Sequence, residues 1–244
     1  MSATHVKAII FDVDGTLADT EDAHRRSFNK AFDESSLNWH WDIPLYDKLL
    51  KTTGGKERIK HYVEACQPAF NKPMDYDGFV KKLHQLKTVH YTTMLQEGGI
   101  PLRPNIQHLV AEARAAGLRL AIATTTSPEN VAALLQQAWG ATGKELFEVI
   151  GCGEIVPHKK PAPDIYFWVL EQLGLNASEC VALEDSENGL RASLAAGVRT
   201  FITTNQYTRT QDFTGAEAVF EDLGDLNRFY IAANLPLSKA AIFV

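Results

Sequence analysis

The amino-acid sequence predicts an α/β protein, with a Rossmann-like doubly wound parallel sheet as its core and an inserted all-helical cap domain. Three observations support this prediction. A short apolar run near the N-terminus has the composition of a buried strand, and the segments after Pro101 alternate between strand-like and helix-like patterns. The residues between these two regions show only helical patterns, over a stretch too long to be a loop within a compact domain.

The predicted first strand spans residues 6–11, with the sequence Val-Lys-Ala-Ile-Ile-Phe. A short, apolar, β-branched run fits an interior parallel strand better than a helix, so Asp12 is expected where that strand ends. In open α/β sheets the ligand crevice lies beyond the carboxyl ends of the strands. Asp12 and Asp14 can converge there on one small cation, and Gly15 lets the backbone turn sharply. The alternative is a solvated acidic turn, because Asp and Gly are common turn residues.

Residues 19–101 are expected to form the helical cap. Near its start, apolar side chains recur at helical spacing at Ala23, Phe28, Ala31 and Phe32. Further helices are predicted over residues 45–50, 57–66 and 75–97, the last with Asp75 as N-cap and Gly98 as stop. Trp39 and Trp41 are assigned to the core of the cap. A cap hinged at residues 17–19 and 102–104 would cover the carboxylates and exclude water.

The predicted catalytic core comprises residues 1–18 and 102–244. Helices are expected at 105–116, from Pro128 onward, at 163–173 and at 186–196. Strands are expected at 118–123, 149–151, 181–183, 200–202 and 218–220. This alternation implies a parallel sheet that is covered on both faces through right-handed crossovers. The tail from residue 234 to residue 244 carries no pattern to which we assign chemistry.

The composition is that of an ordinary globular protein, with 45% hydrophobic and 22% charged residues and a net charge of -6. This charge argues against a nucleic-acid surface, so an anionic substrate needs locally placed cations. Cys66, Cys152 and Cys180 lack paired metal spacing, which favours reduced thiols inside the cell. Without a signal sequence or membrane-spanning run, the expected location is the cytoplasm, or the plastid stroma after removal of a transit peptide. We expect a monomer that binds neither membranes nor nucleic acids.

Three later segments also lie at strand ends or helix starts, and are therefore expected at the same sheet edge as Asp12. In residues 124–127, hydroxyls and free helix N–H groups can bind phosphate oxygens, although Ser127 can simply cap the helix. In residues 159–164, a lysine before two prolines can neutralise a carboxylate and phosphate pair, although such a segment is also an ordinary surface loop. In residues 184–186, the acidic pair can complete a magnesium shell or serve as an N-cap.

These segments resemble the four motifs of the haloacid dehalogenase-like superfamily of phosphotransferases, in order and in context. The matching residues are Asp12-Val13-Asp14-Gly15-Thr16, Thr124, Lys160 and Glu184-Asp185. The inserted cap, Lys-Pro-Ala-Pro-Asp and Leu-Glu-Asp-Ser-x-Asn-Gly resemble the β-phosphoglucomutase-like branch. More narrowly, residues 18–29, 52–59 and 123–127 look like the CbbY type. Its members are xylulose-1,5-bisphosphate phosphatases of the Calvin cycle, and they remove a sugar bisphosphate that inhibits Rubisco.

The resemblance implies a role for each motif residue. Asp12 would attack phosphorus to form an aspartyl-phosphate, and Asp14 would act as general acid and then general base. For the first task Asp14 must be protonated near neutral pH, which requires a raised pKa. Mg2+ would be held by Asp12, the Asp14 backbone carbonyl and Asp185, with Glu184 nearby or acting through water. Thr124 and Lys160 would bind the transferring phosphoryl oxygens.

The cap would then supply substrate specificity. The resemblance implies that Gly54, Gly55, Lys56, Glu57 and Arg58 bind the phosphate that is not cleaved, whereas composition alone favours a solvated helix start. His24 is expected to pair with Asp14 or with sugar oxygens, and Glu21 to accept sugar hydroxyls. Weaker substrate contacts are expected at Tyr46, His84, Lys87, Thr125, Thr126, Asn130 and Asn188.

The sequence therefore predicts a magnesium-dependent phosphatase for a sugar bisphosphate, with xylulose 1,5-bisphosphate as the leading substrate. A β-phosphoglucomutase-like sugar phosphomutase is one alternative. Phosphoglycolate phosphatase is another, but its substrate carries one phosphate and leaves residues 54–58 without a role. A binding module without activity is the non-enzymatic alternative, and the presence of all four motifs weighs against it.

Overall fold

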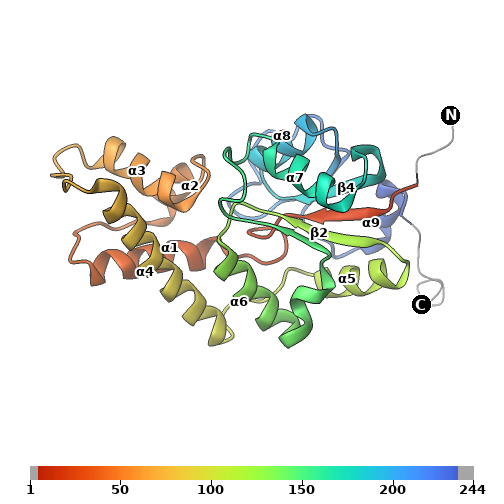
Figure 1. Ribbon diagram of the computed structural model, residues 1–244, viewed down its shortest axis with the longest axis horizontal. Coiled ribbons are helices and arrows are strands. Elements are labelled where there is room, and N and C mark those ends of the chain that lie inside the picture. Colours follow the sequence, from red (N-terminus) through yellow and green to blue (C-terminus); the bar gives the residue numbers. More distant parts are fainter. Residues whose placement is uncertain (1–4, 236–244) are drawn as a thin grey trace.

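The computed structural model describes residues 5–235. It contains a six-stranded parallel sheet in the order β3-β2-β1-β4-β5-β6, with helices on both sides (Figure 1). The strands are β1 (Ala8–Phe11), β2 (Arg119–Ala123), β3 (Val149–Gly151), β4 (Cys180–Glu184), β5 (Arg199–Thr203) and β6 (Ala218–Phe220). This arrangement confirms the predicted doubly wound sheet.

The central strand β1 fixes the position of the first motif. All four of its residues are buried, and it pairs with β2 on one side and with β4 on the other. Phe11 is opposite Ile122 and Leu183, so the chain leaves β1 beside the ends of both neighbours. The crossovers diverge at this point of the strand order, where open α/β sheets bind their ligands. Asp12 is the first residue after the end of β1.

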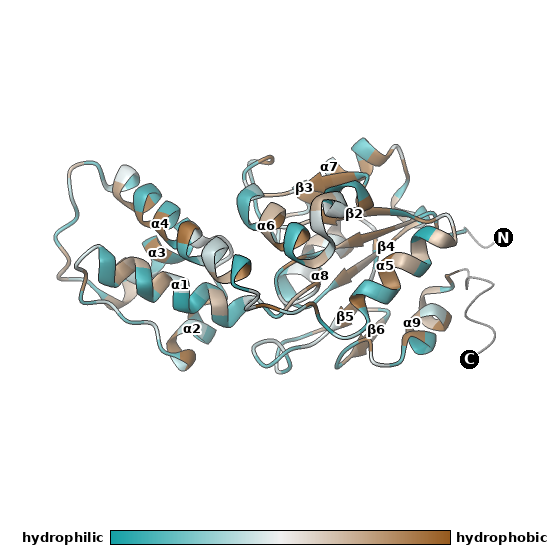
Figure 2. Cartoon of the chain, turned by 90° about the horizontal axis from the view of Figure 1, so that it is seen from below, coloured by the Kyte–Doolittle hydropathy of each residue, from teal (hydrophilic) through white to brown (hydrophobic). Residues whose placement is uncertain are grey.

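Alternate side chains of the strands enter two separate hydrophobic cores. On one face, Ile9 and Phe11 pack with α5 (Ile106–Ala115), α6 (Pro128–Trp139) and α9 (Leu226–Ala233). On the other face, Ala8 and Ile10 pack with α7 (Asp164–Leu173) and α8 (Glu187–Ala195). In Figure 2 the strands are hydrophobic and the helix surfaces away from them are mostly polar, as two-sided burial requires. Helix α9 and the 3-10 turns Gly140–Leu146 and Ala177–Glu179 were not predicted from the sequence.

Four helices lie between β1 and α5, to one side of the sheet (Figure 1). They are α1 (Glu21–Glu34), α2 (Ile43–Leu49), α3 (Gly55–Cys66) and α4 (Tyr76–Gln96). Trp39 and Trp41 lie in their aromatic core, with the Trp41 ring 4.5 Å from that of Phe28, which confirms their assignment. Asp75 caps α4 as predicted, by accepting the backbone N–H of Gly78.

Two short connections join these helices to the sheet. Ala18 and Leu102 form an antiparallel bridge, and the N–H of Arg103 donates to the carbonyl of Leu17 at 2.8 Å. The domain boundaries at 18/19 and 101/102 remain a prediction that fits this pairing. Residues 1–4 and 236–244 of the predicted core, including most of the tail without assigned chemistry, lie outside the described residues. Among the described residues, we find no helix that is long and apolar enough to cross a membrane.

Candidate active site

Three buried carboxylates meet at the carboxyl edge of the sheet. Asp12 follows β1, Glu184 ends β4 and Asp185 comes next; a carboxylate oxygen of each lies within 4.8 Å of the others. Burial raises the pKa of Asp12, against the attraction of Lys160, and it also raises the pKa of Asp185. The ionised cluster therefore needs a cation, and a set of oxygen donors suits a hard divalent metal ion. These residues can hold such an ion.

Glu184 is the most enclosed of the three carboxylates. Its Oε1 accepts from Lys160 Nζ at 2.6 Å and from the hydroxyl of Tyr166, whereas its Oε2 is buried and has no hydrogen-bond partner in the described chain. A Cβ on Gly189 would lie 1.9 Å from Oε2, so the glycine leaves the space that this side chain fills. Tyr166 was not predicted, because an aromatic residue on the apolar face of a helix has no distinctive pattern.

Lys160 lies between two of the carboxylates. Its Nζ donates to Asp12 Oδ1 at 2.7 Å, to Glu184 Oε1 at 2.6 Å and to the carbonyl of Ala123 at 2.8 Å. Its neighbour Lys159 instead pairs with Glu57 of the cap at 2.9 Å. The structure therefore supports the choice of Lys160 as the lysine of the third motif.

Asp14 turns away from the carboxylate cluster and faces the cap. Its Oδ1 accepts from Thr20 Oγ1 at 2.6 Å and from His24 Nε2 at 2.9 Å, which confirms the predicted pairing with His24. His24 Nδ1 lies 2.6 Å from Nζ of Lys87, and its ring stacks on Tyr91. These contacts are consistent with a neutral imidazole that carries its proton on Nε2.

The expected raised pKa of Asp14 is not present in this arrangement. Burial alone would raise it, but His24, the Thr20 hydroxyl and Lys87 together hold the pKa below its usual range. Burial also lowers the pKa of Lys87 to about 7. Asp14 is therefore a carboxylate here, and His24 links it to Lys87, whose lowered pKa lets it exchange a proton near neutral pH.

A cavity of about 660 Å³ lies between the carboxylate cluster and the cap. Most of the predicted site residues line it: Asp12, Asp14, Glu21, His24, Gly54, Gly55, Lys56, Arg58, His84, Lys87, Thr124, Thr125, Thr126, Asn130, Lys160, Asp185 and Asn188. Tyr46, Glu57 and Glu184 do not line it. The Tyr46 hydroxyl instead donates to Glu21 Oε2 at 2.9 Å and accepts from Arg58 Nη1 at 2.9 Å. Whether the lining residues contact a substrate stays a prediction.

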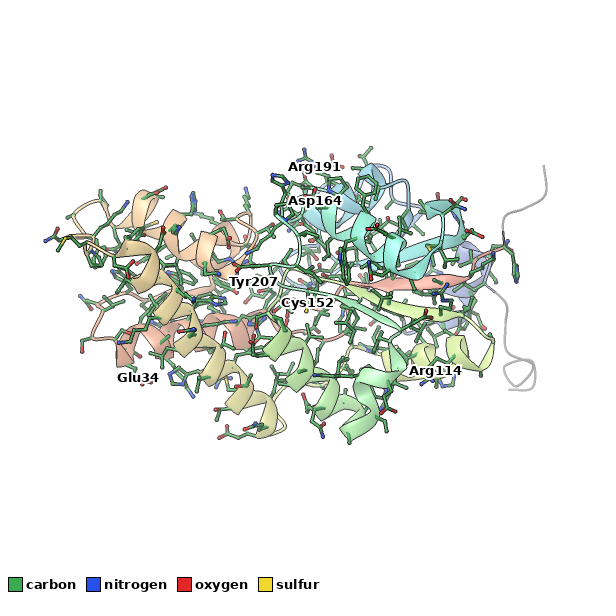
Figure 3. All side chains as sticks on the ribbon, in the orientation of Figure 1. Glu34, Arg114, Cys152, Asp164, Arg191 and Tyr207 are labelled. Carbon is green, nitrogen blue, oxygen red and sulfur yellow. The ribbon has the colours of Figure 1, made fainter. Side chains whose placement is uncertain are left out.

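The loop after β5 contributes residues that sequence reasoning missed. Asn205 donates from Nδ2 to Asp185 Oδ2 at 2.7 Å, and Tyr207 lines the cavity between cap and sheet (Figure 3). The Tyr207 ring also meets that of Tyr46 edge-on, with centroids 6.1 Å apart. The loop contains no recognisable motif, because only the order of the strands in the sheet brings its residues next to Asp185 and the cavity.

Polar contacts join the cap to the core around the mouth of the cavity. Lys56 of α3 pairs with Glu154, Glu57 pairs with Lys159, and Asn188 Nδ2 donates to Thr53 Oγ1 at 3.0 Å. These pairs are partly exposed, so each contributes little stability alone. Together they hold the cap over the carboxylates.

Comparison with known proteins agrees with this geometry. Residues 6–197 match the family model of haloacid dehalogenase-like hydrolases. The chain is 50% identical over 220 residues to the plasmid-encoded protein CbbY of Cupriavidus necator, covering 90% of this chain and 87% of that protein.

Two solved structures extend the comparison. A mutant of CbbY from Rhodobacter sphaeroides, in complex with xylulose 1,5-bisphosphate, has 44% identity and a TM-score of 0.85, covering 91% of this chain and 96% of that one. The β-phosphoglucomutase of Clostridium difficile has 19% identity and a TM-score of 0.76, covering 93% and 96%, and shares the fold.

A parallel sheet with clustered carboxylates, a buried lysine and threonine hydroxyls at its carboxyl edge defines an enzyme that acts on phosphate esters. The chain belongs to the haloacid dehalogenase-like hydrolase family. The resemblance inferred from the four motifs, including the likeness to CbbY, is confirmed.

Proposed function

We propose that this enzyme is a magnesium-dependent phosphatase that hydrolyses xylulose 1,5-bisphosphate. One observation carries the proposal: a single cavity is lined by Asp12, Asp185 and Lys160 from the core and by Lys56 and Arg58 from the cap. A substrate with two phosphates can place one at each set of residues. The ligand of the Rhodobacter sphaeroides CbbY complex is such a molecule.

The core residues would hold the phosphate that is cleaved. Asp12 and Asp185, with Glu184 behind them and the backbone carbonyl of Asp14, would hold Mg2+, which supplies charge neutralisation at the transferring phosphoryl group when bound. Thr124 and Lys160 would bind the phosphoryl oxygens, since catalysis of this transfer is mainly positioning and charge stabilisation. The ion pair between Lys160 and Asp12 at 2.7 Å supports these roles, because it would orient the Asp12 carboxylate for attack.

The reaction would proceed in two displacements. An Asp12 carboxylate oxygen bonds to phosphorus while the bond from phosphorus to the sugar oxygen breaks, and the sugar oxygen takes a proton from the Asp14 carboxyl group. Water then attacks phosphorus and loses a proton to Asp14, while the bond from phosphorus to the Asp12 oxygen breaks, which releases inorganic phosphate and restores the Asp12 carboxylate. Because Asp14 is ionised in this arrangement, we infer that the first proton reaches it through His24 from Lys87, along the hydrogen-bonded chain described above.

The proposal is tested by phosphate release across a panel of sugar phosphates with and without Mg2+. We expect xylulose 1,5-bisphosphate to have the highest kcat/KM, well above that of xylulose 5-phosphate or phosphoglycolate, and chelation of the metal to abolish turnover. Conversion of glucose 1-phosphate to glucose 6-phosphate would instead identify a mutase. Absence of turnover of every ester with added Mg2+ would identify a binding protein.

Replacing Arg58 with Met should weaken binding of the bisphosphate selectively. Arg58 lines the cavity, with its guanidinium 5.2 Å from the centre of the Tyr46 ring, and charge-assisted hydrogen bonds contribute about 1.5–3 kcal/mol each. We expect KM for the bisphosphate to rise roughly 10- to 100-fold. KM for a simple aryl phosphate should stay the same, since that substrate has no second phosphate.

The matched control is Arg25→Met, which removes an arginine of the same cap that binds Asp22 and the carbonyl of Trp41 and does not line the cavity. We expect unchanged KM values for both substrates. If Arg58→Met and Arg25→Met raise KM equally, or if Arg58→Met affects both substrates equally, the second-phosphate assignment is wrong.

A further inference from the structure

Arg103 is a buried arginine in the second connection between cap and core. It is 7% exposed and does not line the active-site cavity. Its backbone N–H donates to Leu17, and the preceding Leu102 bridges to Ala18, so the residue lies where the two connections pair. A buried guanidinium must find hydrogen-bond acceptors, and their identity indicates what it holds in place.

The guanidinium of Arg103 binds backbone carbonyls from three separate segments. Nη1 donates to the carbonyl of Gly15, in the loop after β1, and to that of Thr203 at 2.9 Å. Nη2 donates to the carbonyls of Thr204 at 2.6 Å and Glu221 at 2.9 Å. The planar guanidinium therefore links the loop after β1 to the segments at the carboxyl ends of β5 and β6.

Two of these segments touch Asp185. A Cβ on Gly15 would lie 2.1 Å from Asp185 Oδ2, so the Gly15 backbone rests directly against that carboxylate. Asn205, the residue after Thr204, donates from Nδ2 to the same oxygen at 2.7 Å, and its Nδ2 also lies beside Gly15. Arg103 therefore anchors Gly15 and the residue just before Asn205, and so holds in place the two groups that lie against this carboxylate oxygen.

We propose that Arg103 is a positioning residue that sets the orientation of Asp185 toward the metal, acting through Gly15 and Asn205. This inference rests on the metal site of the proposed function. Lysine cannot replace the arginine fork, because a single ammonium cannot reach carbonyls arranged around a plane. Losing an outer partner of a metal ligand lowers metal affinity about 10- to 100-fold in other sites.

The test measures Mn2+ binding to metal-free protein by electron paramagnetic resonance, which reports free Mn2+ directly. We expect Arg103→Lys and Asn205→Ala each to raise the Kd for Mn2+, the first on the order of 10- to 100-fold. In the double variant the loss of Mn2+ affinity should be smaller than the two single losses combined, because both residues act on one carboxylate. The control Arg119→Lys changes an exposed ion pair with Glu148 at the start of β2 and should leave the Kd unchanged.

Each result of this experiment decides a separate question. Folded Arg103→Lys that binds Mn2+ as tightly as the wild type overturns the role of Arg103 alone. Wild-type protein that binds no Mn2+ overturns the metal site of the proposed function. Circular dichroism checks folding. If Arg103→Lys does not fold, Asn205→Ala decides, and an unchanged Kd in that variant overturns the inference.

Discussion

Replacing Asp12 with Asn is expected to abolish turnover while leaving the fold intact. The amide has nearly the same shape as the carboxylate but is not a nucleophile, so the proposed aspartyl-phosphate could not form. We expect kcat to fall by about 10⁴-fold or more, as when nucleophiles are removed from other covalent enzymes. Phosphate release from xylulose 1,5-bisphosphate measures the loss.

The same substitution should not destabilise the metal-free protein. Burial raises the pKa of Asp12, so its ionised form is costly in the folded state, and Asn removes that charge while Lys160 keeps its pair with Glu184. The thermal midpoint should be unchanged or raised. Asp33→Asn, on an exposed position of α1, is the matched control and should keep full activity. Residual turnover by Asp12→Asn near the wild-type rate would refute the covalent scheme.

Replacing Lys160 with Met is expected to damage both catalysis and stability. The Lys160 side chain is 5% exposed and its ammonium pairs with Asp12 and Glu184, so its removal leaves two buried carboxylates without this cation. Breaking such a buried pair costs about 3–5 kcal/mol of unfolding free energy. If Lys160 binds the transferring phosphoryl group as proposed, losing this donor should lower kcat about 10²- to 10³-fold. Urea denaturation of the metal-free protein and phosphate release measure the two effects.

The adjacent lysine provides the control. Lys159 also forms an ion pair, but its partner Glu57 is 45% exposed, and exposed pairs contribute about 0–1 kcal/mol. Lys159→Met should therefore change the unfolding free energy by less than Lys160→Met, and lower kcat by much less, because Lys159 Nζ pairs with Glu57 and not with the carboxylate cluster. In an Asp12→Asn background, Lys160→Met should lower the unfolding free energy by less than in the wild type, because only one buried carboxylate then loses its cation. Equal losses for the two lysines would contradict the assignment of Lys160.

The sheet was predictable because each strand is a short apolar run whose end is marked by a polar residue. Val181 to Leu183, for example, precede Glu184, and the structure extends this strand to Cys180–Glu184. Helix α9 was missed because it has only eight residues and follows a run of Asp and Gly that resembles a loop. Its helical geometry becomes favourable when Phe229 and Tyr230 enter the core beside β5.

The catalytic edge was predictable from local motifs, whereas the contacts that tune it were not. The alignment of β1 with β4 places Asp12 beside Glu184 and Asp185, as expected for adjacent parallel strands. His24 and Lys87 lie 63 positions apart in the sequence, and together with the Thr20 hydroxyl they lower the pKa of Asp14, against the expected direction. Such a pair depends on how α1 and α4 pack, and sequence spacing does not report that.

The antiparallel bridge between Ala18 and Leu102 has a consequence for how such enzymes can diversify. The polypeptide leaves the sheet and re-enters it at almost the same point, so residues 19–101 can be replaced as one continuous segment. A chimera that joined the four-helix segment of another phosphatase at this bridge would keep every strand and every buried carboxylate. Selectivity could then be transplanted while Asp12, Lys160, Glu184 and Asp185 stayed in place, but the new segment would have to supply its own partners for Asp14, because His24 and Lys87 leave with the old one.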